Sequence, residues 1–516
     1  DMGYYGTLIF QEAPAKVGNN VSIIPYLSTR TTDDFNPETK QDWALDAGGD
    51  IKIGITPSLN LDLTYRPDFS QVEVDAQVTN LTRFNIFFPE RRQFFIENND
   101  IFSAFGQFAD NPFYSRRIGL DANGRTVPIQ YGARLTGNIS ERTRIGLLNM
   151  QTQSKPDRPG ENYSAAVFQR RFWQRSSFSG IFLNRQSFDG GRAVEGNYGR
   201  NLGGEIAMST PDSKWEGELG YLQSFKDGIS GDNQHVYSHF AYSGQRFRTF
   251  LDLQHLGSNY YADMGFTGRL VNYDPDTDSF VRLGYTQVSN MIDFYTYPAH
   301  HPRVNFHWSG LENFVWINDE TGLNEWYTRL RHFIFFQNTS ELRFRLNNNF
   351  VDLIFPFGLT DTPLPVGDYN MTEFNVEFRT DQRRRLNTGW SVVYGQFFNG
   401  NKLTYEGNIR FRVQPWGNFT VGIEQNDIWL PEPYGNLHLT LASLRAEINF
   451  STRLFWTTFL QYNTQADNFN INSRLQWRFA PMSDVFLVYT DNYRVAGIFG
   501  PKERTVALKV NYWLTL

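Results

Sequence analysis

The last twelve residues of the chain alternate between two kinds of side chain, and this pattern constrains the fold more than any other feature. A period of two over this length is that of a β-strand with one apolar and one polar face. The more apolar face consists of Val506, Leu508, Val510, Tyr512, Leu514 and Leu516, and the other consists of Thr505, Ala507, Lys509, Asn511, Trp513 and Thr515. We therefore expect a strand here whose one face contacts lipid.

The same alternation recurs upstream, with arginine at the polar positions. Ile409 and Phe411 alternate with Arg410 and Arg412, and similar patterns occur within 341–346 and 471–479. Arginine at every second position of a strand is difficult to place in the dry core of a β-sandwich. It suits a transmembrane β-barrel, in which alternate residues face lipid and a wet lumen.

The composition favours the same class of protein. Aromatic residues make up 16% of the chain, yet the mean hydropathy is −0.47, a combination that a barrel with aromatic girdles and a polar lumen explains. The longest apolar runs, such as 333–336, are far below the roughly 18 residues of a spanning helix. The chain has no cysteine, and its net charge is −6. We expect a protein of the cell outer membrane, with the lipid bilayer and no nucleic acid as a partner.

The lengths of the predicted connections give a second signal. Short links near 57–59, 137–140 and 210–213 alternate with longer ones such as 186–192 and 257–277. Outer-membrane barrels have short periplasmic turns and longer outer loops. We therefore predict an all-β fold, a single antiparallel barrel over 20–516 with about 24 strands, within a range of about 22–26. We expect residues 1–19 to be a periplasmic lead-in and the last strand to pair with the first. A soluble propeller or tandem sandwiches are the alternative, but no 40–50-residue repeat appears and the final strand is uniformly apolar on one face.

Residues 67–120 lack the alternation and are the exception in this chain of strands. Barrels of about 22 strands or more are wide enough to need filling, so we expect this segment to be a plug in the lumen. Phe88, Phe94 and Phe95 are its predicted core. Buried charges must be paired, and the residues expected to form ion pairs in the plug and lumen are Glu90, Arg91, Arg92, Glu97, Asp100, Arg116 and Arg117.

The same segment carries a resemblance to a known family. The runs 68–75, 88–97, 100–102 and 113–119 resemble a bacterial outer-membrane family of uncharacterised function. In that family the barrel follows a periplasmic domain similar to a family-nine carbohydrate-binding module, which implies that such a domain, or another envelope protein, is a partner. That domain is not part of this sequence, so no residue here is assigned to sugar binding. This chain has Ile96 and Asn98 where the family often has leucine and glycine.

Possible chemical sites have simpler explanations. The run 274–278 begins like a calcium loop but lacks the later glycine and glutamate, so we expect a solvated loop. His300 and His301 are expected in an exposed turn. The chain has no Gly-x-Ser-x-Gly motif, and Glu90 and Glu97 are better explained by pairing with arginine than as a glycosidase couple. We predict no catalytic residue, no cofactor and no metal site.

Two functions remain open. The first is a channel or gated conduit for an unknown solute, with a glycan as one candidate, because the inner face is rich in arginine and asparagine. The second is a structural or accessory barrel of a secretion, assembly or surface-display complex, because a long plug would block flow. An enzyme is a distant third.

Overall fold

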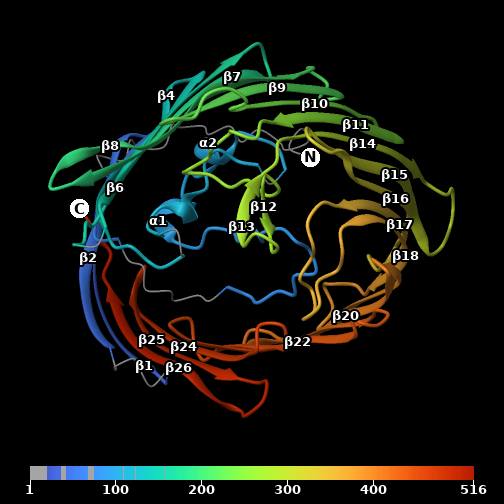
Figure 1. The fold of residues 1–516 in the computed structure, drawn as a ribbon. Helices are drawn as coiled ribbons and strands as arrows, with labels where there is room; N and C mark the ends of the chain where they lie inside the picture. Colours follow the sequence, from blue (N-terminus) through green and yellow to red (C-terminus); the bar gives the residue numbers. More distant parts are fainter. Residues whose placement is uncertain (1–19, 36–41, 68–74, 109, 122–123, 157) are drawn as a thin grey trace.

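The computed structural model describes residues 20–35, 42–67, 75–108, 110–121, 124–156 and 158–516. The predicted lead-in 1–19 and the motif residues 68–74 lie outside the described residues. The strands form one ring (Figure 1). Its members are β1 (Val21–Asp34), β2 (Asp42–Thr56), β3 (Leu59–Tyr65), β4 (Ile129–Ser140), β5 (Thr143–Thr152), β6 (Gly160–Phe172), β7 (Ser176–Asp189), β8 (Arg192–Ser209), β9 (Trp215–Lys226), β10 (Gln234–Ser243), β11 (Phe247–Leu256), β14 (Tyr285–Thr296), β15 (Val304–Asn318), β16 (Gly322–Phe336), β17 (Glu341–Leu353), β18 (Gly367–Arg379), β19 (Leu386–Phe397), β20 (Gly400–Val413), β21 (Gly417–Trp429), β22 (Asn436–Asn449), β23 (Leu454–Asn463), β24 (Asn468–Ala480), β25 (Ser483–Arg494) and β26 (Gly500–Asn511).

The ring is closed by its first and last strands. Strand β1 pairs antiparallel with β26, with Thr29 opposite Leu508 and Thr32 opposite Thr505. The two-residue strand β27 (Leu514–Thr515) continues the line of β26 and also pairs with β1. The prediction of a closed antiparallel barrel of about 24 strands is therefore confirmed, with 24 strands in the ring.

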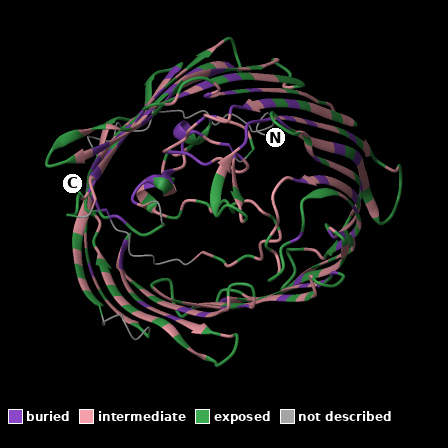
Figure 2. Ribbon diagram, in the orientation of Figure 1, coloured by how far each residue is buried: buried purple, intermediate pink, exposed green. Residues whose placement is uncertain are grey.

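Side chains on neighbouring strands share faces as the alternation predicts. Val506, Leu508 and Val510 are among the exposed apolar residues, whereas Thr505 and Lys509 are half-buried. Exposed and less exposed residues alternate around the whole ring (Figure 2). A closed barrel leaves no strand edge unpaired in lipid, and its apolar outer surface suits the hydrocarbon layer. The chain is an outer-membrane β-barrel.

One end of the barrel carries mostly short connections, such as 57–58, 141–142 and 481–482, with a longer one at 297–303. The predicted turn at 137–140 was placed too early, because β4 continues to Ser140 across a register shift between Asn138 and Ser140. A bulge of this kind adds a residue to a strand without ending it.

The opposite end carries the longest connections, although those at 319–321 and 398–399 are short. The expected long loop at 186–192 is wrong, because β7 and β8 are joined by only Gly190 and Gly191. Both glycines have positive φ angles, of 55° and 80°, which a two-residue hairpin turn commonly requires.

Two connections from this second end turn into the ring (Figure 1). The first contains α1 (Gln93–Ile96), α2 (Asp100–Ser103) and the short 3-10 helix η2 (Ser115–Arg117). We call its residues 75–108 and 110–121 the inner segment. The second, residues 257–284, contains the hairpin of β12 (Val271–Asp274) and β13 (Ser279–Arg282), and we call it the inner hairpin segment. The sequence predicted only a loop at 257–277.

The described residues include no helix with the length and apolarity needed to span a membrane.

The largest apolar core lies between the inner segment and one side of the wall. Phe95, Phe102 and Ile118 of the inner segment are buried against the inner faces of β5 to β11. The wall residues of this core include Leu148, Met150, Val167, Ile181, Leu183, Leu222, Tyr237 and Leu256. The inner segment is therefore attached to a defined sector of the barrel, and this attachment positions the charged groups described next.

Candidate functional site

Glu90 and Arg92 form the most densely bonded pair of the inner segment. The Arg92 guanidinium donates from Nε and Nη2 to the two Glu90 carboxylate oxygens, at 2.9 and 2.7 Å. Arg92 also donates to the carbonyl oxygens of Ser115, at 2.6 Å, and Ile118, at 2.7 Å. The Ser115 hydroxyl donates to Glu90 at 2.6 Å. The pair therefore holds the α1 region against the η2 region of the same segment.

Asp75 joins two further predicted arginines. It accepts from Arg91 Nε at 2.7 Å and from both Nη atoms of Arg116, at 3.1 and 2.6 Å. Arg116 also donates to the carbonyl oxygen of Pro89 at 2.8 Å. Burial raises the pKa of the Asp75 carboxyl, but the hydrogen bonds and charges of Arg116 and Arg91 outweigh it and hold that pKa below its usual range.

Charged contacts also tie the inner segment to the wall strands β2 to β5. Arg134 of β4 is paired with Asp62 of β3 at 2.7 Å, and both side chains are buried. The same guanidinium donates to the carbonyl oxygens of Phe94 and Glu97. The Glu97 carboxylate pairs with Lys52 of β2. Arg144 of β5 pairs similarly with the Asp100 carboxylate.

The aromatic residues predicted as a core take different positions. Phe95 is buried, with 4% of its surface exposed, and Phe94 packs against the same cluster. Phe88 is half-buried, with the guanidinium of Arg116 over its ring. The apolar contacts of the segment are made largely with the wall, which sequence reasoning did not predict.

The inner segment is bonded to the inner hairpin segment as well. Asn111 and Phe266 exchange backbone hydrogen bonds of 2.8 and 2.9 Å. The predicted ion-pair residue Arg117 donates from Nε to the carbonyl oxygen of Gly265 at 3.1 Å. The two inward connections are thus joined through their backbones.

Glu325 of β16 holds both inward connections to the wall. Its carboxylate pairs with Arg83 of the inner segment at 2.5 Å and with Arg269 of the inner hairpin segment at 2.7 Å. Arg269 stacks on the Trp316 ring, 3.9 Å from its centroid. Glu325 is 5% exposed. Its partners lie 242 and 56 positions away in sequence, so no local signal in the sequence marks this three-way contact.

Asp110 is a second buried carboxylate shared by the two connections and the wall. It accepts hydrogen bonds from the Tyr285 hydroxyl, from Gln254 Nε2 at 3.1 Å and from the Gly268 backbone at 3.0 Å. Burial raises the pKa of the Asp110 carboxyl against the opposing effect of these donors.

A cavity of about 300 Å³ lies where these connections meet the wall. Arg83, Arg269 and Asn324 supply polar groups to it, and Phe84 and Trp316 supply aromatic ones. Arginine, amide and aromatic side chains together provide both hydrogen bonds and flat apolar surface for a polar solute.

Apart from an apolar cluster near the connections, which includes Leu353, Phe397 and Ile428 and contacts Leu81 of the inner segment, the lumen-facing side of strands β17 to β25 is polar. Asn347 donates to Glu373 at 2.9 Å, and Arg345 donates to Glu377 at 2.8 Å. Amide and hydroxyl pairs continue this surface around the ring at Asn375–Ser391, Thr404–Asn426, Asn470–Asn492 and Asn472–Thr490. The inner segment reaches this side through Asn80, which exchanges hydrogen bonds with Gln465.

The acidic run and the histidines considered from sequence lie in turns. Asp274 accepts from the Asp276 backbone at 3.0 Å and the Thr277 hydroxyl at 2.7 Å, at the tip of the β12–β13 hairpin. His301 Nδ1 accepts from the Val304 backbone at 2.8 Å. These bonds are those of ordinary turns.

Comparison with known proteins gives one family match. The model of a domain of unknown function (DUF5916) matches residues 20–149, a range that includes the inner segment. No curated protein sequence matches the chain.

Solved structures of outer-membrane proteins are similar at low scores. The siderophore receptor PirA from Pseudomonas aeruginosa has a TM-score of 0.45 and 7% identity, over 95% of this chain and 80% of that one. PirA from Acinetobacter baumannii has a TM-score of 0.45 and 8% identity, over 97% and 81%. The ferric citrate transporter FecA has a TM-score of 0.40 and 9% identity, over 96% and 79%. At these scores, the function of this chain has to be derived from its own residues.

Proposed function

We propose that the protein is a gated conduit of the outer membrane and that the inner segment is its plug. The observation that carries the proposal is an asymmetry of the inner wall. The inner segment buries most of its apolar side chains against β5 to β11, whereas the opposite wall, apart from the apolar cluster that contacts Leu81, presents amide, hydroxyl and paired charged groups. A polar lumen wall is suited to passage of a hydrated solute.

The contacts that hold the plug are of a kind that permits movement. Beyond the apolar contacts, its attachments to the wall include ion pairs and hydrogen bonds at Lys52, Arg134, Arg144 and Glu325. Each charged group released from such a pair can be hydrated in a lumen, which lowers the cost of opening relative to that in a dry core.

The solute we propose is a polar one, of which a polyol or oligosaccharide is the favoured class. The cavity beside Arg83, Arg269 and Trp316 supports this, because it combines hydrogen-bonding and aromatic groups. The resemblance to a family with a carbohydrate-binding-like periplasmic domain supports the same class of solute and makes such a domain the proposed partner.

A disulfide lock tests the gate directly, since the chain has no native cysteine. A Cβ placed on Gly146 of β5 would lie 2.9 Å from Ile101 Cγ2 of α2, so Ile101→Cys with Gly146→Cys brings two thiols within bonding range. We expect channel openings in planar bilayers from the reduced double variant and a loss of these openings after oxidation.

The control is a disulfide that leaves the plug free. Thr404→Cys with Asn426→Cys joins opposed residues of β20 and β21, and its oxidation should leave openings unchanged. Equal conductance of the locked and reduced plug variants would contradict the gate. Silence of the wild type, continuing after deletion of 80–110, would instead favour the scaffold function, in which the barrel supports an envelope complex.

A further inference from the structure

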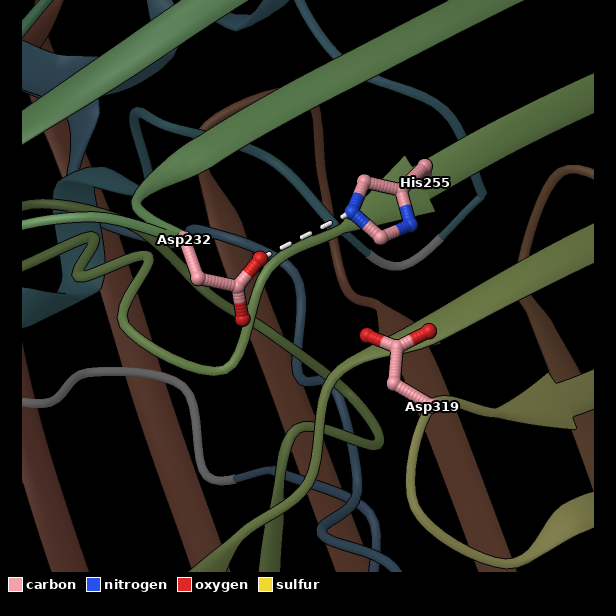
Figure 3. A group of neighbouring side chains, drawn as sticks. All are labelled: Asp232, His255 and Asp319. Atoms are coloured by element: carbon pink, nitrogen blue, oxygen red, sulfur yellow. Dashed lines mark ion pairs between the residues drawn. The ribbon is translucent and has the colours of Figure 1, made fainter.

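Three metal-ligating side chains meet at the rim of the barrel, away from the plug contacts. Asp232 comes from the connection between β9 and β10, His255 from the end of β11, and Asp319 from the connection between β15 and β16. One potential ligand atom from each lies within 4.8 Å of the others. Figure 3 shows the imidazole and the two carboxylates pointing toward a common space.

Neighbouring groups orient His255 and Asp232 toward this space. Thr286 Oγ1 lies 3.1 Å from His255 Nδ1, which leaves Nε2 directed at Asp232 Oδ1, 3.8 Å away. The Ser258 backbone and hydroxyl donate to Asp232 Oδ2, at 2.6 and 2.7 Å. Gln234 Nε2 lies 3.3 Å from Asp232 Oδ1 and 3.5 Å from His255 Nε2. Outer partners of this kind fix ligands in metal sites.

Asp319 faces the other two groups without a counter-charge of its own. Within the described part of the chain, its carboxylate has no hydrogen-bond or ion-pair partner. Gly284 makes room for this carboxylate, because a Cβ there would lie 2.4 Å from Asp319 Oδ2. Two carboxylates are thus held close together beside one imidazole.

We propose that Asp232, His255 and Asp319 form a binding site for a divalent transition-metal ion such as Zn²⁺. One imidazole and two carboxylates are a ligand set that Zn²⁺ accepts, and the imidazole favours it over Ca²⁺. Three protein ligands leave a position open for water or an anionic group. The site is independent of whether the barrel conducts.

The position of the site gives it a structural consequence. Ser258, which orients Asp232, stands at the start of the inner hairpin segment, and Gly284, which borders Asp319, is its last residue. The Asp319 backbone also donates to the Gly284 carbonyl oxygen at 3.1 Å. A bound ion therefore joins two rim connections and the end of β11 at the place where the inner hairpin segment leaves and rejoins the wall.

Zn²⁺ titration by calorimetry of the purified full chain in detergent, after chelator treatment, tests the site. We expect about one equivalent to bind, and His255→Ala and Asp319→Asn each to weaken binding at least about tenfold. The matched control is His438→Ala, which removes an exposed histidine 2.8 Å from Asp427 on neighbouring strands and should leave binding unchanged. Ca²⁺ should not compete at equal concentration.

Hydrogen exchange of residues 257–284, with Zn²⁺ and with chelator, tests the consequence. Zn²⁺ should slow exchange there in the wild type and in His438→Ala, but not in His255→Ala. Absence of binding to the wild type, or equal binding by His255→Ala and Asp319→Asn, would overturn the site. If Zn²⁺ binds but hydrogen exchange of residues 257–284 does not change, the ion does not stabilise the inner hairpin segment.

Discussion

At the residue scale, Glu90 collects the hydrogen bonds that hold two parts of the inner segment together. It is nearly buried, at 7% side-chain exposure, and its carboxylate receives the Arg92 guanidinium, the Ser115 hydroxyl and the backbones of Arg91 and Arg92. Burial raises the pKa of Glu90, but the hydrogen bonds and charge of Arg92 together with the Ser115 bond outweigh it, so that pKa lies below its ordinary value of 4.5.

Arg92→Ala should loosen the inner segment. It leaves a buried carboxylate without its counter-charge, and such a loss costs about 3–5 kcal/mol. We expect faster hydrogen exchange across residues 88–118 at pH 7 and a smaller free energy of local opening. Arg383→Ala, which removes an exposed partner of Asp381, is the control and should leave exchange unchanged.

The cost of Arg92→Ala should also depend on pH. A carboxyl with a depressed folded-state pKa stabilises the fold above its unfolded value of 4.5, and this stabilisation is lost as the pH falls through the folded-state pKa. A protonated Glu90 no longer needs a cation. The difference between wild type and variant should therefore shrink as the pH falls below 4.5 and through the lower folded-state pKa; a constant difference would contradict this origin.

Sequence reasoning found the charged residues of the plug but few of their partners. Glu90 with Arg92 is a pair two positions apart, whereas Glu97 meets Lys52 and Asp100 meets Arg144 across distances that no local pattern encodes. Asn98 is a different case. Its φ angle is 53°, a left-handed conformation in which glycine is free of strain and asparagine is tolerated.

At the scale of elements, the strands were predictable and their ends were not. A period of two persists along each strand because one face contacts lipid. Turns depend on single residues. The glycine pair at 190–191 makes the connection between β7 and β8 shorter than predicted, and the bulge near Ser140 places the turn after β4 later than predicted. The β12–β13 hairpin was missed because four-residue strands inside a lumen need no lipid-facing alternation.

The facing of β26 gives a prediction for one element. Leu508→Arg should cost about 2–4 kcal/mol if the site lies near mid-membrane, falling toward zero near an interface. Lys509→Leu, one residue along, should cost much less, because that side chain lies over the Phe486 ring on the lumen side. Urea unfolding in lipid vesicles measures both. A harmless Leu508→Arg with a damaging Lys509→Leu would mean that the faces are reversed.

At the scale of the whole molecule, the inner segment and the inner hairpin segment enter the barrel from the same rim. Outside the apolar core, both contact the same wall residue, Glu325. The inner segment packs on β5 to β11, and Arg83 and Arg269 bring both connections to Glu325 on β16. If the inner segment is held on one wall by its apolar core and on another by ion pairs with Glu325, these ion pairs can break while the core stays packed. We call the ion pairs of Glu325 with Arg83 and Arg269 the latch. The latch is thus the contact whose loss should open a path along the polar wall.

Glu325→Gln should release this latch. The amide removes the negative charge and leaves two half-buried guanidinium groups facing each other, at a cost of about 3–5 kcal/mol. We expect cells with this variant to admit large antibiotics that the wild type excludes. Glu377→Gln is the matched control, because Glu377 pairs with Arg343, Arg345 and Arg379 on the wall alone. Permeability should stay at the wild-type level in that variant, since the loss of a wall cluster leaves both inward connections attached. If both variants raise permeability equally at equal protein amounts, the cause is damage to the barrel and not release of the plug. If the permeability of cells with Glu325→Gln equals that of the wild type, the contact at β16 does not hold the plug.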